Sequence, residues 1–69
     1  MVEIFKTNVK KKKRSEQIIS LLSKKYPDLR INFDLEDCDK ILRIEGDNFC
    51  PIRITKKMQK LGHKCLVLE

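Results

Sequence analysis

The spacing of hydrophobic residues along the chain alternates between strand-like and helix-like. Residues 2–9 mix apolar and polar positions at strand-like intervals. Residues 12–25 place their apolar side chains at helical spacing, which predicts a helix with one buried face. The predicted members of that face are Ile18, Ile19, Leu21, Leu22 and Tyr26. Pro27 follows and ends the helix, because the residue before a proline is biased away from helical geometry.

The clearest strand pattern lies between residues 29 and 35. Its apolar members alternate with polar residues and predict a half-buried strand; they are Leu29, Ile31, Phe33 and Leu35. The polar segment Glu36–Asp39 separates this strand from a second one over residues 40–45, so the pair predicts a hairpin with an acidic tip. Leu42 and Ile44 are expected on the buried face of the second strand.

A polar break then precedes a second predicted helix. Asp47 or Asn48 is expected to cap this helix, and Pro51 is tolerated because a proline fits the first turn. Its core-facing residues are predicted to be Ile54, Met58 and Leu61. Gly62 is expected just past the helix end, where a positive φ angle is needed. Residues 63–69 are expected to form the last strand.

This order of elements, βαββαβ, predicts one α+β domain over residues 1–69 with a ferredoxin-like arrangement. Right-handed crossovers place both helices on one face of a four-stranded antiparallel sheet with strand order 4-1-3-2. The segment Lys10–Arg14, the hairpin tip and the turn at Gly62 then share one end of the molecule. Ile4 and Ile41 do not fit the inward alternation, so they either point outward beside Arg43, or Ile4 adjusts through a bulge.

Composition is typical of a folded chain with a basic surface. Of its 69 residues, 41% are hydrophobic and 38% are charged, and the formal charge is +6. No apolar stretch approaches the roughly 20 residues of a membrane span or resembles a signal peptide, which predicts a cytoplasmic location. Three widely spaced cysteines fit neither a disulfide framework nor a Cys-x-x-Cys module, so reduced thiols are expected.

The candidate functional residues are five adjacent cations at the junction of the first strand and first helix: Lys10, Lys11, Lys12, Lys13 and Arg14. The first turn of a helix exposes backbone N–H groups and a positive dipole end, so each cation there is disfavoured by a few tenths of a kcal/mol. A cluster of cations at this positive helix end, together with the exposed N–H groups, builds a pocket for an anion. The alternative is a solvated charge run that serves solubility alone.

The chain resembles the heavy-metal-associated domain family, the small ferredoxin-like modules of copper chaperones and metal-transporting ATPases. The resemblance covers nearly all 69 residues and rests on element order, on Leu61-Gly62-His63 before the last strand and on the Ile18-anchored first helix. The family binds a soft cation through a Met-x-Cys-x-x-Cys loop. Counting back from Ile18 puts its two cysteine positions at Lys11 and Arg14, so this chain resembles a degenerate member that lacks the metal motif.

Metal binding outside that loop is the first alternative. Cys38 and Cys65 belong to opposite sheet edges, three strand spacings of about 4.8 Å or roughly 14 Å apart, so they cannot share one ion. His63 and Cys65 are only two ligands, where a structural zinc site takes four, and Cys50 lies at the far end. The sequence therefore predicts no metal and no cofactor.

Two other functional classes find little support. The open sheet face has no aromatic platform for stacking bases, so a weak, phosphate-based contact is all that is expected with nucleic acid. Acylphosphatases share the fold and use an arginine in this loop, but the chain lacks their glycine-bearing loop, and the hairpin carboxylates are typical turn residues. No catalytic residues are predicted.

The sequence thus predicts a small non-catalytic binding module that recognises an acidic protein surface or another anion through Lys10–Arg14. A basic loop and an acidic tip at one end form a dipolar surface, which suits steering toward a complementary protein. Heavy-metal transport through cysteines outside the loop and weak nucleic-acid binding remain the alternatives. An apolar spot at Ile4 and Ile41 on the open sheet face would also suit a homodimer.

Overall fold

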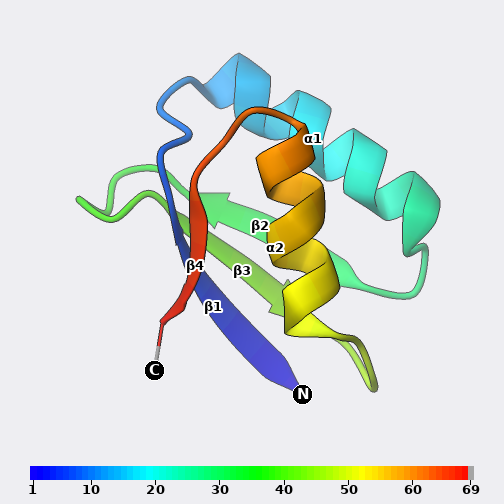
Figure 1. Ribbon diagram of the computed structural model, residues 1–69. Helices are drawn as coiled ribbons and strands as arrows, with labels where there is room; N and C mark the ends of the chain where they lie inside the picture. Colours follow the sequence, from blue (N-terminus) through cyan, green and yellow to red (C-terminus); the bar gives the residue numbers. More distant parts are fainter. Residues whose placement is uncertain (69) are drawn as a thin grey trace.

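The fold is an α+β arrangement of the ferredoxin-like type, as predicted. The computed structural model describes residues 1–68. Its elements are β1 (Val2–Thr7), α1 (Lys12–Lys25), β2 (Arg30–Asp34), β3 (Ile41–Glu45), α2 (Pro51–Lys60) and β4 (Cys65–Leu68). The strands pair antiparallel in the order β2-β3-β1-β4 (Figure 1). The predicted last strand also included Glu69, which lies outside the described residues.

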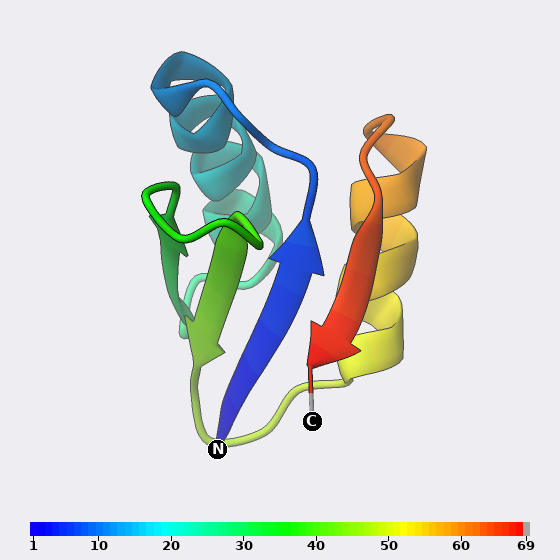
Figure 2. The same ribbon diagram turned by 90° about the vertical axis from the view of Figure 1, so that its left-hand side faces the viewer.

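Both helices cover the same face of the sheet, and the other face carries no helix (Figure 2). The two ends of the described chain lie close together, because the start of β1 runs beside the end of β4 and pairs Ile4 with Leu68. The predicted β1–α1 loop, hairpin tip and α2–β4 turn gather at the opposite end (Figure 1). None of the helices within residues 1–68 is long and apolar enough to cross a membrane.

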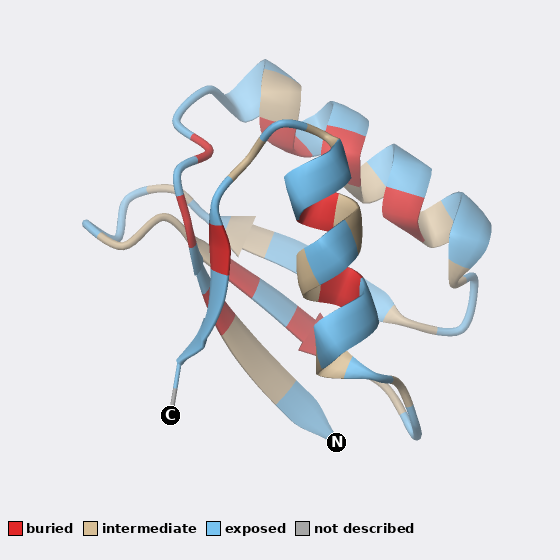
Figure 3. Ribbon diagram, in the orientation of Figure 1, coloured by how far each residue is buried: buried red, intermediate tan, exposed pale blue. Residues whose placement is uncertain are grey.

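The core lies between the sheet and the two helices (Figure 3). Its fully buried side chains come from both layers and are Phe5, Val9, Ile18, Leu22, Leu42, Ile44, Ile54, Met58 and Cys65. The prediction for Leu21 was wrong, because this side chain is 42% exposed. Leu21 precedes Leu22 by one residue, and a rotation of about 100° per residue turns it away from the buried stripe. Leu61 is only partly buried at the end of α2.

The first strand ends two residues earlier than the pattern suggested. The hydroxyl of Thr7 accepts a hydrogen bond from the backbone N–H of Val9 at 3.2 Å and donates one to the carbonyl of Lys40 at 2.6 Å. These bonds turn the chain out of the sheet after Thr7. Val9 is nevertheless fully buried, so it fixes the base of the loop that carries the lysines.

The predicted cap of α2 was also wrong. Neither Asp47 nor Asn48 caps the helix, because Cys50 occupies the N-cap position without a side-chain hydrogen bond. Pro51 is the first helical residue and sets this start, since its fixed φ suits the first turn and its missing N–H needs no acceptor. At the other helix end Gly62 has a φ of +88°, as predicted.

Candidate anion-binding surface

The predicted lysines lie on an exposed loop at the start of α1. Lys10 precedes the helix, Lys11 is its N-cap residue, and Lys12 and Lys13 begin its first turn; all four are exposed. No side chain caps this helix and no acidic residue stands in its first turn. The backbone N–H groups of that turn, which no side chain caps, therefore lie next to exposed lysines.

The cations of the molecule are concentrated in the helices. α1 contains five cations and one carboxylate, that of Glu16, whereas α2 contains four cations and no acidic residue. The ion pairs formed within residues 1–68 are Lys6–Asp39 at 3.4 Å and Arg43–Glu45 at 3.8 Å. Both involve strand residues, so within the described chain the cations of Lys10–Lys13 and of the helices have no carboxylate partner. The helix layer is strongly positive.

A cationic groove between the two helices was not identified from the sequence. It has a volume of about 250 Å³ and is lined by Lys25, Tyr26, Arg53, Lys56, Lys57 and Lys60. The ammonium of Lys25 lies 5.9 Å from the centroid of the Tyr26 ring, within cation–π range. The signal was present in the sequence, because the four cations of α2 are spaced i, i+3, i+4 and i+7 and must share one side of a helix.

Arg14 differs from the neighbouring lysines, because its guanidinium binds within the chain. Its Nε donates to His63 Nε2 at 3.0 Å, one Nη donates to the carbonyl of Leu61 at 3.0 Å, and the other donates to Gln17 Oε1 at 3.3 Å. These bonds fasten the start of α1 to the turn between α2 and β4. A guanidinium has five N–H donors, so two remain for an external anion.

His63 is held neutral by the same network. Asn8 Oδ1 lies 3.2 Å from His63 Nδ1 and accepts a bond from the Lys64 N–H at 3.0 Å. Because Arg14 can only donate, Nε2 must accept, and the proton of a neutral ring then sits on Nδ1 and faces Asn8. Partial burial and the charge of Arg14 lower the pKa of His63 below its usual 6.5. Both ring nitrogens are engaged within the chain.

The three cysteines are unpaired and lie in different environments. Cys38 is exposed on the hairpin beside Asp37 and Asp39, and the donor atoms of these three side chains lie within 4.8 Å of one another. Asp37, however, accepts a bond from the Asp39 N–H at 2.8 Å, and Asp39 pairs with Lys6. The carboxylates therefore shape the turn, as the sequence predicted.

Cys65 lies on the far edge strand and is 1% exposed. Burial raises the pKa of its thiol to about 11, although a hydrogen bond with Thr55 acts in the opposite direction. The thiolate is the form that binds soft metals, so this cysteine is a poor ligand as long as the domain stays folded.

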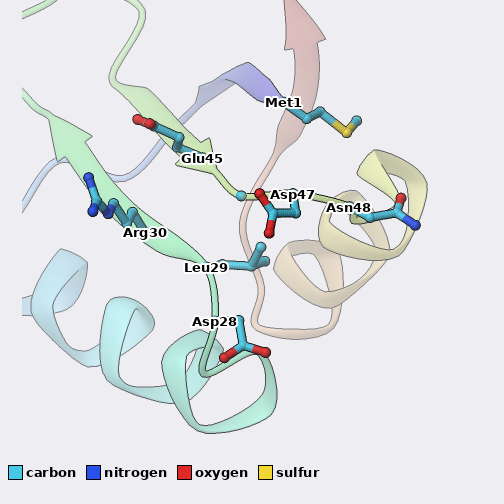
Figure 4. A pocket seen from close by; sticks show the side chains of 8 residues that line it. Met1, Asp28, Leu29, Arg30, Glu45, Asp47 and Asn48 are labelled. Atoms are coloured by element: carbon cyan, nitrogen blue, oxygen red, sulfur yellow. The ribbon is translucent and has the colours of Figure 1, made fainter.

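The opposite end of the molecule is acidic. A hollow of about 590 Å³ lies there, and Figure 4 shows the carboxylates of Asp28, Glu45 and Asp47 around it, together with Arg30. Arg30 and Glu45 are cross-strand partners on β2 and β3. Around this hollow carboxylates therefore outnumber cations, in contrast to the helix layer.

Ile4 and Ile41 lie on the open face of the sheet. Residues 2–6 pair with residues 45–41 without interruption, so Ile4 stands opposite Arg43 and alternates with the buried Phe5. The bulge considered as an alternative is absent from this register. Both isoleucines are half-buried, and the homodimer expected through this face stays a prediction.

Comparisons with protein-family models, with curated proteins and with solved structures gave no match for the chain. Membership of the heavy-metal-associated family therefore stays a prediction. The function has to be argued from the charge distribution and the geometry of the chain itself.

Proposed function

We propose that this protein is a small non-catalytic binding module that docks on an acidic protein surface through its Lys10–Lys13 loop, with Arg14 as an anchored fifth cation. The observation that carries the proposal is the absence of a carboxylate partner for these lysines within residues 1–68. No carboxylate neutralises the positive electrostatic field of this exposed cluster. The field speeds association with a negatively charged partner and disfavours positively charged ones.

The rigidity of the loop base supports the same proposal. Val9 is fully buried on one side of the lysines, and Arg14 is bonded to Leu61 and His63 on the other. A short segment fixed at both ends loses less conformational entropy on binding than a free tail would. The loop is thus partly preorganised for a partner.

An acidic protein is favoured over the other anions by the shape of the surface. The lysines lie on an exposed loop at one end of the domain (Figure 1), and the hollow next to this loop is lined by Glu16 as well as by Lys13 and Arg14, so it is not shaped as an all-cationic channel for a nucleic-acid backbone. Metal transport has weaker support, because the loop is cationic and would repel an incoming metal ion. Neither alternative has an observation in its favour comparable to the unpaired lysines.

The experiment is a titration of the isotope-labelled protein with poly-L-glutamate, a model acidic polypeptide, followed by backbone amide chemical shifts. We expect the largest shifts at residues 10–14 and weaker binding as salt is added. The triple variant Lys11→Gln, Lys12→Gln and Lys13→Gln should bind about tenfold more weakly, because each lost surface charge contact contributes about 0.5 kcal/mol and a tenfold change in affinity corresponds to about 1.4 kcal/mol.

A matched control removes the same number of charges elsewhere. Lys6→Gln, Arg30→Gln and Arg43→Gln neutralise three exposed cations of the open sheet face, and this variant should bind as tightly as the parent after correction for net charge. Equal weakening by both triple variants would show a general charge effect and defeat the proposal. Shifts confined to the groove lined by Arg53, Lys56 and Lys60 would move the site to the helices.

A competition with duplex DNA distinguishes the two kinds of anion. The nucleic-acid alternative would be favoured if DNA displaced poly-L-glutamate at a phosphate concentration far below the carboxylate concentration, and if DNA binding fell steeply as salt is added. Weaker or equal competition by DNA is the result expected for a protein-docking loop.

A further inference from the structure

The two edges of the sheet differ in the chemistry of their side chains. β2 and β4 are the edge strands. β2 exposes Arg30, Asn32 and Asp34, and charged side chains on an edge discourage pairing with a strand of another molecule. β4 exposes Leu66, Val67 and Leu68 and carries no charge from Cys65 to Leu68. The β4 edge therefore lacks the protection that the β2 edge has.

Exposed hydrophobic residues gather beside this unprotected edge. Seven large hydrophobic side chains are exposed within residues 1–68, and five of them belong to the chain start or to β4: Met1, Val2, Leu66, Val67 and Leu68. Leu66 is 63% exposed, more than any other large hydrophobic residue of the strands. Leu68 stands opposite Ile4 on the open face, so the apolar surface continues from β4 onto β1. Contiguous exposed apolar surface of this kind marks interaction sites.

The charges of α2 are turned away from this edge. Thr55 lies beside the Cys65 thiol, and Gln59 lines a hollow together with Cys65 and Leu66, so neutral side chains of α2 flank β4. The four cations of α2 line the groove toward α1 instead. Among the described residues Lys64 is the one cation that lines the hollow beside β4. A second molecule with the same charge of +6 can therefore approach here with less repulsion than at any helix surface.

We infer that two copies of this chain pair through β4 in antiparallel orientation, which joins their four-stranded sheets into one. Antiparallel pairing of a strand with its own copy is two-fold symmetric and uses the same surface twice, so it closes at a dimer. A register centred on Val67 sets Leu66 of one copy against Leu68 of the other on the open face. Each exposed leucine of β4 then gains an apolar cross-strand neighbour.

The pairing does not depend on the proposed function, but it would affect it. A two-fold axis perpendicular to the joined sheet keeps the helices of both copies on one face. The dimer then presents two cationic helix layers side by side, and two linked sites bind a partner with repeated acidic segments more tightly than one site does.

Sedimentation velocity over a range of concentrations tests the dimer. A short strand edge gives a small interface and an affinity in the micromolar range or weaker, so the range runs from about 10 µM to about 1 mM. We expect the mass to rise from 8.2 kDa toward twice that value. Leu66→Lys should remain monomeric throughout, because it places a charge on the paired edge. Leu21→Lys makes the same change at an exposed position of α1 and should dimerise like the parent.

Amide hydrogen exchange separates edge pairing from stacking of the open faces. In an edge dimer, the β4 amides that point away from β1 should exchange more slowly as the concentration rises. This measurement uses the unmodified chain, so it tests pairing through β4 even if Leu66→Lys fails to fold. A monomer at all concentrations would overturn the inference. So would a dimer that survives Leu66→Lys, or one dissolved by Ile41→Lys without any change in β4 exchange.

Discussion

The Nε of Arg14 donates a hydrogen bond to His63 Nε2 at 3.0 Å, across 49 positions of the sequence. The bond joins the first turn of α1 to the turn before β4, and Asn8 holds the same imidazole from its other side at 3.2 Å. Arg14 and the neutral His63 thus hold two turns together at the end of the molecule that carries the lysine loop. This contact fixes the position of the loop relative to the sheet.

The double-mutant cycle of Arg14→Ala and His63→Ala should show that the two side chains stabilise the fold together. Each single change is expected to lower the free energy of unfolding by about 1 kcal/mol, and the double variant by less than the sum, because both remove the same bond. Chemical denaturation measures all four proteins. Arg14→Lys is the control that keeps the charge and loses the planar fork, and it should not restore stability. Strict additivity would contradict the contact.

Stability should fall as pH decreases through the ordinary pKa of histidine. The folded-state pKa of His63 lies below 6.5, so the unfolded chain binds the proton more readily than the folded chain. Protonation therefore lowers the free energy of unfolding. The charged group that contacts the ring, Arg14, is a cation and opposes protonation. Stability is therefore complete above pH 6.5 and declines from there to the lowered pKa of the folded state, below which no further loss comes from this residue.

Thermal unfolding of the parent and of His63→Gln from about pH 8 to about pH 5 measures this effect. The difference between the two melting temperatures should shrink as the pH falls, since the variant lacks the titrating ring and shares every other group. An NMR titration of the His63 ring supplies an independent value. A midpoint at or above 6.5 in the folded protein would contradict the predicted direction.

The element order and most of the core followed from the sequence because they depend on local periodicity, and the strand order then followed from the handedness of the crossovers. Residues 29–35 alternate strictly, and the bounds predicted for the first helix agree with α1. Leu21 was misassigned because five apolar residues make a stripe wider than the sheet can cover. Asp47 and Asn48 were misassigned as caps because good capping residues do not themselves fix where a helix begins, whereas Pro51 does.

The candidate site was only partly accessible from the sequence. The lysine run is local, so its position at a helix start could be predicted directly. The bonds of Arg14 to Leu61 and His63 join residues almost fifty positions apart and depend on how two turns meet in space. The groove between the helices could have been anticipated from the spacing of the α2 cations, but its Tyr26 wall depends on the packing of α1.

Truncation of a buried side chain should lower the stability of the fold much more than truncation of the exposed Leu21. Met58→Ala should lower the free energy of unfolding by about 2 to 5 kcal/mol, because Met58 is fully buried and its loss leaves a cavity. A domain of this size has little stability to spare, so we expect the variant to be largely unfolded at 37 °C. Leu21→Ala is the matched control and should change stability by less than about 0.5 kcal/mol. Circular dichroism with urea unfolding compares the two.

The thiols should divide into two reactive groups in the folded protein. Cys38 and Cys50 are exposed and should react with a thiol reagent at the rate of a free cysteine. Cys65 should react at least about a hundredfold more slowly at pH 8, because its pKa of about 11 leaves little thiolate and the side chain is buried. In denaturant all three rates should converge. Fast labelling of Cys65 in the native state would show that β4 opens readily.

Serine variants of the three cysteines test the metal alternative. Titration with Zn(II) and Cu(I) should detect no stoichiometric site at the lysine loop, since its field repels cations and it contains no thiolate. Any binding at the hairpin should be weak, because the carboxylates beside Cys38 are engaged with the Asp39 N–H and with Lys6. A sub-micromolar site abolished by Cys38→Ser or by Cys65→Ser would reverse this expectation and favour a metal-handling protein over a docking module. Cys50→Ser is the control, because Cys50 lies at the other end of the molecule.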